Sequence, residues 1–426
     1  MNGNIRSVAL RIALCAALIT GICKPAGATT LCVNPGGTGG CFSKIGLAVS
    51  AALPNDTINV ASGTYKEDVV IGKALSLIGA NRNNTIIDAT GLSNGVYIDG
   101  LDHTGLSNVV VRGFTVENAN YEGILVTNAS GVTVWGNIVV YNDKSLEPSI
   151  PACPGQPAFE TAESDDCGEG IHLIGVDHSI LTNNTLENNA GGVLLTDETD
   201  ETHDNLITGN VVRNNPFDCG ITLASHPPYS RTTLGVIHNT ISNNDSLHNG
   251  YQVPGAGAGV GIFGFLPGAT VSGNVVINNR LRNNGLPGVA FHAHYTGGAG
   301  ENLNDNIIVC NQISGNGADT GDAETPGPTG INVYGYYAIT GTIISQNVID
   351  HEAYDLFVNT PAQVDAHLNT FLGRDDVGVD NSSSSTVNAT ENWWGCFGGP
   401  GAEGCTTVDG SGVLFTPLLT RPFQGR

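Results

Sequence analysis

The chain has 426 residues, of which 58 are glycine and 44 are asparagine, and only 13% are charged. The good helix formers Glu, Lys, Met and Arg are scarce, so this composition argues against a largely helical protein. A hydrophobic content of 40% is enough for a core and argues against wholesale disorder, and a formal net charge of −23 argues against a nucleic-acid partner.

Residues 1–28 are predicted to be a secretory signal. Arg6 and Arg11 form a basic start, residues 12–23 form an apolar run, and Ala-Gly-Ala at 26–28 fits the small-x-small cleavage pattern. Because the run is too short to span a bilayer, we expect a secreted or periplasmic protein without a membrane span. Removal of this segment lowers the formal net charge to −26, so a polyanionic ligand would be repelled unless a cation bridges it.

An amino-terminal cap is predicted over residues 29–57. The apolar residues that recur at helical spacing just before the first strand are Phe42, Ile45, Val49 and Leu53. Their spacing indicates a capping helix over 42–53, which would cover the exposed edge and core of the structure that follows.

The middle of the chain, residues 58–380, repeats a short motif in which two polar positions, usually asparagines, stand five residues apart with apolar residues between them. The copies begin at Asn137, Asn184, Asn210, Asn239, Asn274 and Asn311, with a degraded copy at Asn347. A second marker is Gly followed by Val or Ile, and its shortest complete interval, from Gly170 to Gly192, is 22 residues. Short strands of period 2 that are punctuated by Gly and Asn predict a parallel solenoid.

Each type of residue in this repeat has a predicted place. Gly and Asn supply positive φ at the turns, and asparagines at one place in each coil are expected to stack into hydrogen-bonded ladders. Val, Ile and Leu at alternate positions are expected to stack inwards as a continuous core. Roughly a dozen coils would make a rod about 55–60 Å long.

The repeat resembles that of right-handed parallel β-helix proteins of the pectate-lyase-like superfamily, NosD-type periplasmic proteins included. The opening segments at 56–60, 63–67 and 75–79 are similar to the first coils of many secreted β-helices. This resemblance implies an all-β fold, a single-stranded right-handed parallel β-helix, and says little about function. Residues 381–426, with Asn-Trp-Trp-Gly at 392–395, resemble the carboxy-terminal segment of bacterial β-helix proteins and are predicted to form a disulfide-bearing cap.

Eight cysteines follow the predicted signal, and six of them form close pairs across Gly-, Pro- or acid-rich loops. The predicted disulfides, which are typical of an oxidising compartment, are Cys32–Cys41, Cys153–Cys167 and Cys396–Cys405. Cys219 and Cys310 would lie nearly three coils apart, roughly 13 Å, which exceeds the Cα limit of about 7 Å for a disulfide. We therefore predict two free buried thiols.

Insertions into a solenoid indicate where function lies, because they are not needed for stacking. The predicted insertions are 143–168, 225–232, 245–258, 295–303 and 317–329. They flank both margins of the sheet made by the Gly-Ile/Val strands, as walls would flank a groove. Two interpretations remain open: a groove that binds a polysaccharide, and a polar exterior with chance aromatics.

Alternation along these strands selects the residues that would line the groove. If Ile171 and Leu173 face inwards, His172 faces outwards, and a register error of one residue would reverse this. The candidate substrate-binding residues are His172, Tyr229, His294, Tyr334 and Tyr336. Aromatic and polar side chains of this kind suit sugar rings and hydroxyls.

Whether the protein is an enzyme is left open by the sequence. Hydrolysis of a glycosidic bond needs two carboxyl groups about 5–9.5 Å apart, for which the acids near the groove are candidates. A polysaccharide lyase needs a base and a cation that neutralises the uronate, roles that His226 and Arg231 would suit. The candidate catalytic residues are Asp166, Asp197, His226, Arg231 and His292.

Cofactors also remain open. His292 and His294 would lie on one strand face about 6.6 Å apart and would bind copper or zinc if a third ligand were present, although the sequence does not identify one. Calcium would fit the clustered acids. We expect a monomer that binds, and in one interpretation degrades, an extracellular polysaccharide. The alternative is a non-catalytic surface or periplasmic protein, adhesin-like or NosD-like and metal-associated.

Overall fold

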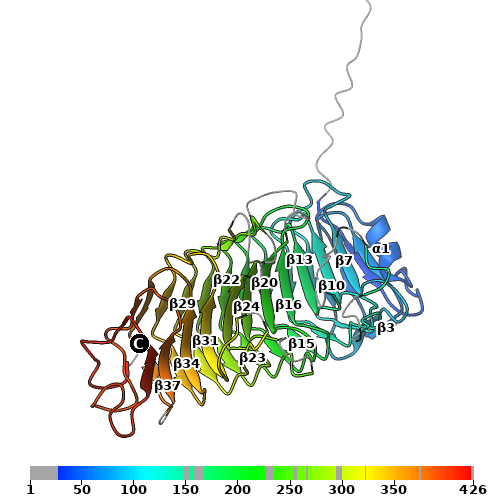
Figure 1. The fold of residues 1–426 in the computed structure, drawn as a ribbon. Coiled ribbons are helices and arrows are strands. Elements are labelled where there is room, and N and C mark those ends of the chain that lie inside the picture. The colour runs from blue at the N-terminus through cyan, green and yellow to red at the C-terminus, as the bar shows by residue number, and fades with distance from the viewer. Residues whose placement is uncertain are drawn as a thin grey trace, which may run out of the picture.

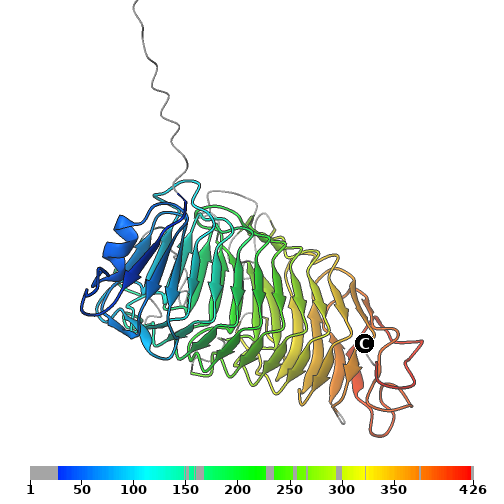
Figure 2. The same ribbon diagram turned by 180° about the vertical axis from the view of Figure 1, so that it is seen from behind.

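The computed structural model describes residues 27–147, 149, 153–157, 159, 167–226, 235–252, 257–264, 267–293, 300–321, 323–373 and 376–423. The candidate residues Asp166, Tyr229, Arg231 and His294 lie outside these ranges, as do the first 26 residues, and only the backbone of His292 is described. The described chain coils into an elongated stack of parallel strands, seen from two sides in Figures 1 and 2. The predicted all-β parallel solenoid is confirmed.

A complete coil places one strand in each of three sheets, named here A, B and C. In the coil that starts at Ile171, strand β13 (Ile171–Ile174) belongs to sheet C, β14 (Ile180–Thr182) to sheet A and β15 (Thr185–Glu187) to sheet B. The next coil begins with β16 (Val193–Thr196), in which Val193 lies opposite Ile171. This coil therefore takes 22 residues, the interval between Gly170 and Gly192 in the sequence. The coil from β2 to β5, in which Asp56 lies opposite Leu75, is shorter and takes 19.

The strands run through the stack in chain order within each sheet. Sheet A contains β1 (Thr30–Val33), β2 (Asp56–Val60), β5 (Leu75–Gly79), β8 (Val110–Arg112), β11 (Thr133–Trp135), β14, β18 (Leu206–Thr208), β22 (Thr240–Ser242), β26 (Val275–Ile277), β29 (Ile307–Val309), β32 (Ile343–Ser345), β35 (Val364–His367), β38 (Val387–Asn388) and β40 (Val413–Leu414). Sheet B contains β3 (Gly63–Tyr65), β6 (Thr85–Asp88), β9 (Thr115–Glu117), β12 (Ile138–Val140), β15, β19 (Val211–Arg213), β23 (Asp245–Leu247), β27 (Arg280–Arg282), β30 (Gln312–Ser314), β33 (Val348–Asp350) and β36 (Thr370–Phe371).

Sheet C carries the strands that begin with Gly-Val or Gly-Ile markers. It contains β4 (Val69–Ile71), β7 (Val96–Asp99), β10 (Ile124–Thr127), β13, β16, β20 (Ile221–Ser225), β24 (Val260–Gly264), β28 (Val289–Ala293), β31 (Thr329–Tyr334), β34 (Tyr354–Asn359), β37 (Val377–Asn381) and β39 (Thr407–Gly410). A short ribbon of β17 (Thr202–His203), β21 (Val236–Ile237) and β25 (Val271–Ser272) lies between sheets C and A in three of the coils.

Helix α1 (Ile45–Ala51) lies at the amino-terminal end of the stack (Figure 1). It is shorter than the predicted 42–53, because Lys44 and Ala52 at its two ends both have extended backbone. Its first two backbone N–H groups, those of Ile45 and Gly46, donate to the carboxylate of Glu67 at 2.7 and 2.9 Å. This carboxylate satisfies donors that a helix terminus leaves unpaired.

The core is one continuous column of inward-facing apolar residues. In the coil described above, Ile171, Leu173, Leu181 and Leu186 are all fully buried in one cluster that extends through the whole stack. Sheet C supplies two inward residues to this coil and sheets A and B one each, which is the alternation that the sequence predicted. Burial of this kind supplies the dominant favourable term in folding.

Asparagine ladders run along the corners, as predicted. Each ladder residue accepts the backbone N–H and the side-chain N–H of its counterpart one coil earlier; Asn210, for example, accepts both from Asn184 at 3.0 and 3.1 Å. One ladder consists of Asn137, Asn184, Asn210, Asn244, Asn279, Asn311, Asn347 and Asn369, and ends at Asn392. The residue before each of them has a positive φ, 53° at Asn183 and 66° at Gly209. Many of the asparagines and glycines of the composition are therefore corner residues.

The three predicted disulfides are present, Cys32–Cys41, Cys153–Cys167 and Cys396–Cys405. Cys219 and Cys310 are free, as predicted, but only Cys219 is buried, whereas Cys310 is partly exposed at a corner with φ of 58°. The prediction of two buried thiols is thus wrong for Cys310. Among the described residues, no helix has the length and apolarity that a membrane crossing requires.

Candidate functional site

The outer face of sheet C is the face that the sequence analysis selected. Ile171 and Leu173, which were predicted to face inwards, belong to the main core, so the predicted register is confirmed; Ile221 with Leu223 and Val289 with Phe291 take the same positions on their strands. Phe159, in the predicted insertion 143–168, lies beside this face, because its ring stacks on Tyr97 of β7 with ring centroids 6.5 Å apart. The disulfide-bonded Cys153 and Cys167 pack with Tyr121 just ahead of β10.

At the level of β10, β13, β16 and β20, the outer face of sheet C is covered and is not the open groove that was predicted. His172 of β13 does point away from the core, yet its exposed fraction is 0%. The outward residues on the neighbouring strands, Leu125, Leu194 and Thr222, are buried as well. Alternation along a strand determines which way a side chain points, but burial depends on what the insertions place over the sheet. The expectation of an exposed His172 was therefore wrong.

A buried polar cluster lies on this face at the level of β10, β13, β16 and β20. At one margin, Glu122 and Glu169 each stand two residues before a strand of the sheet, and both are fully buried. A carboxylate oxygen of Glu122 accepts the backbone N–H of Glu169 at 2.7 Å. His172 continues the cluster across the sheet: its Nδ1 lies 3.8 Å from Glu122, and its Nε2 lies 2.9 Å from the hydroxyl of Thr196.

The other margin holds Asp197 and Glu198, which follow β16 directly, and His226, which follows β20. Asp197 accepts the hydroxyl of Ser225 at 2.8 Å and the backbone N–H of His226 at 2.9 Å. The imidazole Nδ1 of His226 lies 3.0 Å from Oε1 of Glu198. His226 therefore holds both carboxyl groups, with its backbone on one and its ring on the other.

The two carboxyl groups have pKa values displaced in opposite directions. Burial raises the pKa of Asp197, assisted by the nearby charge of Glu198 and opposed by the hydrogen bonds from His226 and Ser225. Burial also acts to raise the pKa of Glu198, but His226, His172 and Thr196 together outweigh it and leave that pKa below its ordinary value. One group thus holds a proton more tightly and its neighbour less tightly, which is how acid and base roles are separated at many active sites.

Tyr334 and Tyr336 lie farther along the same sheet and line a pocket of about 370 Å³. Their rings meet edge to face with centroids 5.5 Å apart. Tyr334 is almost buried, whereas Tyr336 is 52% exposed. The remaining lining residues are Glu324, Gly335, Asn359, Pro361, Ser382, Ser383 and Ser384. An exposed aromatic ring among amide and hydroxyl groups is a lining that suits a sugar.

Of the ten candidate catalytic and binding residues, the structure therefore brings His172, Asp197 and His226 into one cluster. Tyr334 and Tyr336 lie in a separate pocket, and His292 is placed in β28 by its backbone alone. Sequence reasoning missed Glu122. The signal was its position two residues before a strand, which is the position that Glu169 takes in the next coil.

Comparisons with known proteins agree with this fold. The family model described as the right handed beta helix region matches residues 78–275. The resemblance to right-handed parallel β-helix proteins that the repeat showed is thereby confirmed, and the described strands of the same stack continue on both sides of the matched segment. A search of curated proteins found no match by sequence.

Solved structures show the same architecture at low identity. DFA-IIIase from Arthrobacter chlorophenolicus A6 without its lid is 12% identical, with a TM-score of 0.57 over 91% of this chain and 99% of that one. The GH136 lacto-N-biosidase from Eubacterium ramulus is 12% identical, with a TM-score of 0.51 over 92% and 67%. The Dettilon tailspike protein is 13% identical, with a TM-score of 0.55 over 83% of this chain, which spans 61% of the tailspike. At these identities the likeness establishes the fold alone.

Proposed function

We propose that the protein is an exported, monomeric carbohydrate-processing enzyme that binds a glycan along the outer face of sheet C and hydrolyses it at Asp197 and Glu198. Both carboxyl groups are buried in this structure, so the proposal requires that the cover over them opens when the glycan binds. The observation that carries this proposal is the geometry of two adjacent carboxyl groups, Asp197 and Glu198, which are held by the backbone N–H and the imidazole of one histidine, His226. The opposite directions of their pKa shifts support it. Three disulfides support export to an oxidising compartment. The lacto-N-biosidase is a precedent for carbohydrate chemistry on this fold.

The two carboxyl groups have different roles in the proposed reaction. Asp197, whose pKa is raised, protonates the oxygen of the leaving sugar as the general acid. Glu198, whose pKa is lowered, stays ionised and acts as the base or the nucleophile. His226 is a positioning residue that holds both groups through its backbone N–H and its imidazole.

The Tyr334–Tyr336 pocket is proposed as a more distant binding subsite. Four strand spacings, from β16 through β20, β24 and β28, separate the carboxyl pair from β31. At 4.7–4.9 Å each, they amount to about 19 Å along the axis. A ligand that reaches both places must be an oligosaccharide or a longer chain.

Charge narrows the class of glycan. The formal net charge is −23, and the outer face of sheet C carries buried carboxylates at both margins of the cluster. An acidic polysaccharide would be repelled from this surface. We therefore propose a neutral glycan as the substrate.

The test is an activity screen of the chain from Thr29 onwards. Neutral oligosaccharides and acidic glycans are incubated with the protein, while new reducing ends report hydrolysis and absorbance at 235 nm reports unsaturated uronides. We expect reducing ends from a neutral glycan, with turnover reduced at least 100-fold in Glu198→Gln and in Asp197→Asn. Asp365→Asn, on an exposed carboxylate of sheet A, is the matched control and should retain full activity.

A second candidate is the non-catalytic binding protein. It is favoured by the complete burial of Glu122, Glu169 and His172, which is also how a purely structural network would look. Glycan binding that persists in Glu198→Gln, with no reducing ends and no uronides from any substrate, would support this candidate and reject the enzyme.

A further inference from the structure

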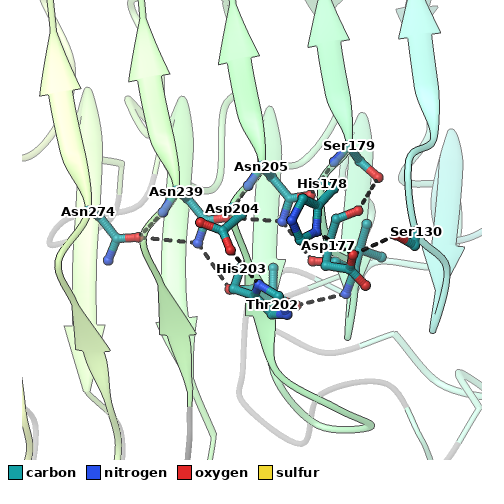
Figure 3. A network of polar contacts seen from close by, with 11 residues as sticks. Ser130, Asp177, His178, Ser179, Thr202, His203, Asp204, Asn205, Asn239 and Asn274 are labelled. Atoms are coloured by element: carbon teal, nitrogen blue, oxygen red, sulfur yellow. Dashed lines mark hydrogen bonds and ion pairs between the residues drawn. The ribbon is translucent and has the colours of Figure 1, made fainter.

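Two Asp/His pairs occupy the same corner on consecutive coils, outside the cluster described above. Asp177 and His178 precede Ser179, and His203 and Asp204 precede Asn205 in the next coil. A parallel bridge pairs Asp177 with His203, so the two dipeptides lie side by side (Figure 3). The sequence indicates that the two dipeptides take equivalent positions, since each directly precedes a residue of the hydrogen-bonded ladder, Ser179 in one coil and Asn205 in the next.

The side chains of the two pairs converge. The rings of His178 and His203 lie 5.6 Å apart, edge to face at 82°. One ligand atom from each of His178, His203 and Asp204 lies within 4.8 Å of the other two. Small rotations of exposed side chains would bring such atoms to the separations found around one metal ion.

Carboxylates surround these imidazoles. Nδ1 of His178 lies 2.6 Å from a carboxylate oxygen of Asp177, which also accepts the hydroxyl of Ser130 at 2.5 Å. A carboxylate behind one ring nitrogen is a common outer-shell arrangement at metal sites, and it leaves Nε2 for the ion. Nδ1 of His203 likewise lies 2.9 Å from a carboxylate oxygen of Asp204.

The backbone behind the side chains is rigidly held. The backbone N–H of Ser179 donates to the side chain of Asn205 at 2.9 Å, and the backbone N–H of Asn205 donates to the side chain of Asn239 at 3.0 Å. These bonds belong to a second asparagine ladder, in which Asn205, Asn239 and Asn274 are labelled in Figure 3. His178 and Asp204 themselves occupy turn positions with φ of 49° and 53°. The spacing between the two pairs is therefore fixed by the solenoid itself.

We propose that His178, His203 and Asp204 form a binding site for one divalent transition-metal ion of the zinc or copper class, with Asp177 orienting His178. Imidazole nitrogens with one carboxylate oxygen are the donors that such ions prefer over magnesium or calcium. The side chains are 64%, 29% and 48% exposed, so the ion would be reached directly from solvent and would retain water ligands. This site is independent of the glycan proposal and differs from the predicted His292–His294 pair.

The test is a zinc titration of untagged, chelator-treated protein by calorimetry, with stoichiometry checked by elemental analysis. We expect one equivalent at micromolar or tighter dissociation constant, weakened at least tenfold in His178→Ala and in His203→Ala. His351→Ala is the matched control, because His351 makes the same contact with Asp350 at 2.8 Å and is 78% exposed. Its zinc affinity should stay within twofold of the parent.

Thermal melts distinguish a loss of zinc binding from a loss of folding. Thermal melts without zinc should be alike for all three variants, and saturating zinc should raise the melting temperature of the parent and of His351→Ala only. Should either alanine variant fail to fold, His178→Gln or His203→Gln takes its place. Zinc binding that is undetectable at millimolar concentration, or that is unchanged in a His178→Ala/His203→Ala double variant, would overturn the proposal.

Discussion

Glu352 takes the place of an asparagine at the end of a ladder and accepts the hydrogen bonds of Asn316. The backbone N–H of Asn316 donates to both carboxylate oxygens at 3.0 and 3.1 Å, and its side-chain N–H donates to one of them at 2.9 Å. The ladder that reaches Glu352 passes through Asn189, Asn215, Asn249 and Asn284. A titrating group thus stands where the earlier rungs of this ladder have a neutral amide.

The stability of the protein is expected to depend on the charge of Glu352. Burial raises its pKa from 4.5 to about 8, with smaller contributions from Asp350 and Asp376, against the opposing bonds from Asn316. Since the folded state keeps this proton to higher pH than the unfolded state, the stabilisation is complete below pH 4.5 and is lost as pH rises towards 8. Relative to Glu352→Gln, the parent should lose on the order of 4 kcal/mol between these limits.

Urea unfolding at pH 5 and pH 8.5 measures this difference. Glu391→Gln, at an exposed carboxylate, should follow the parent at both values. Equal pH dependence in the parent and in Glu352→Gln would show that Glu352 is not the titrating group.

The ladders are expected to contribute strongly to stability at single positions. Asn279 accepts the two N–H bonds of Asn244 and donates to Asn311 and to the carbonyl of Ile241, all between 2.9 and 3.1 Å. Asn279→Ala removes these partners inside the fold, and stranded buried groups cost about 1–3 kcal/mol each. We expect a loss of about 3 kcal/mol or more in urea unfolding.

The neighbouring residue provides the control for the ladder. Asn278 is exposed and has a φ of 57°, so Asn278→Gly keeps the turn and breaks no ladder bond. Its unfolding free energy should stay within about 1 kcal/mol of the parent. Similar losses in the two variants would argue against a special role of the ladder.

The proposed hydrolysis should have an acidic pH optimum. Activity requires Glu198 to be ionised and Asp197 to be protonated, so kcat/KM rises as Glu198 loses its proton and falls as Asp197 loses its own. His226→Ala removes the group that lowers the pKa of Glu198, so the acid limb should move to higher pH. An unmoved acid limb with a uniformly lower rate would contradict the role given to His226.

The exposed tyrosine should contribute to glycan affinity without contributing to chemistry. Tyr336→Ala removes an aromatic surface worth about 1 kcal/mol or more, so affinity for a long oligosaccharide should fall about fivefold or more. Tyr251, which is also exposed but stacks on His248 away from this pocket, gives the control Tyr251→Ala. Equal effects of the two substitutions in glycan affinity gels would remove Tyr336 from the binding surface.

The two free cysteines should react differently with a thiol reagent. Cys219 is 1% exposed, and burial, with the charge of Asp218 second, raises the pKa of its thiol well above the ordinary value. Cys310 is partly exposed. Native protein should therefore show one reactive thiol, which Cys310→Ser removes, and denatured protein should show two. A count of zero after denaturation would mean that the two are bonded.

Local sequence patterns were sufficient to predict the parallel solenoid, its inward-facing residues and its disulfides. Period-2 alternation identified Ile171 and Leu173 as inward, and the close spacing of Cys396 and Cys405 predicted their disulfide. Both features depend on residues that are near in sequence or that recur once in each coil. The capping helix was predicted too long because apolar spacing does not show that Lys44 adopts an extended backbone.

Burial on the outer face could not be predicted in the same way. His172 is buried beside Glu122 and Thr196, which come from the coils on either side of its own, and the sequence of one coil does not show such contacts. The meeting of His178 with His203 needed the coil register across 25 residues of unequal turns. The sequence places each residue within its own coil, whereas a site on this fold depends on what neighbouring coils place beside it.

The ladders have a consequence for how such a protein can change over time. Successive rungs are separated by as few as 22 residues, between Asn347 and Asn369, and by as many as 47, between Asn137 and Asn184, yet the rung bonds keep the same length of 3.0 Å. The number of residues between two rungs therefore does not change the rung bonds. In the evolution of such a protein, one loop between rungs can therefore be replaced by another while the β-helix is kept. A new ligand-binding surface can arise in this way without a change of fold.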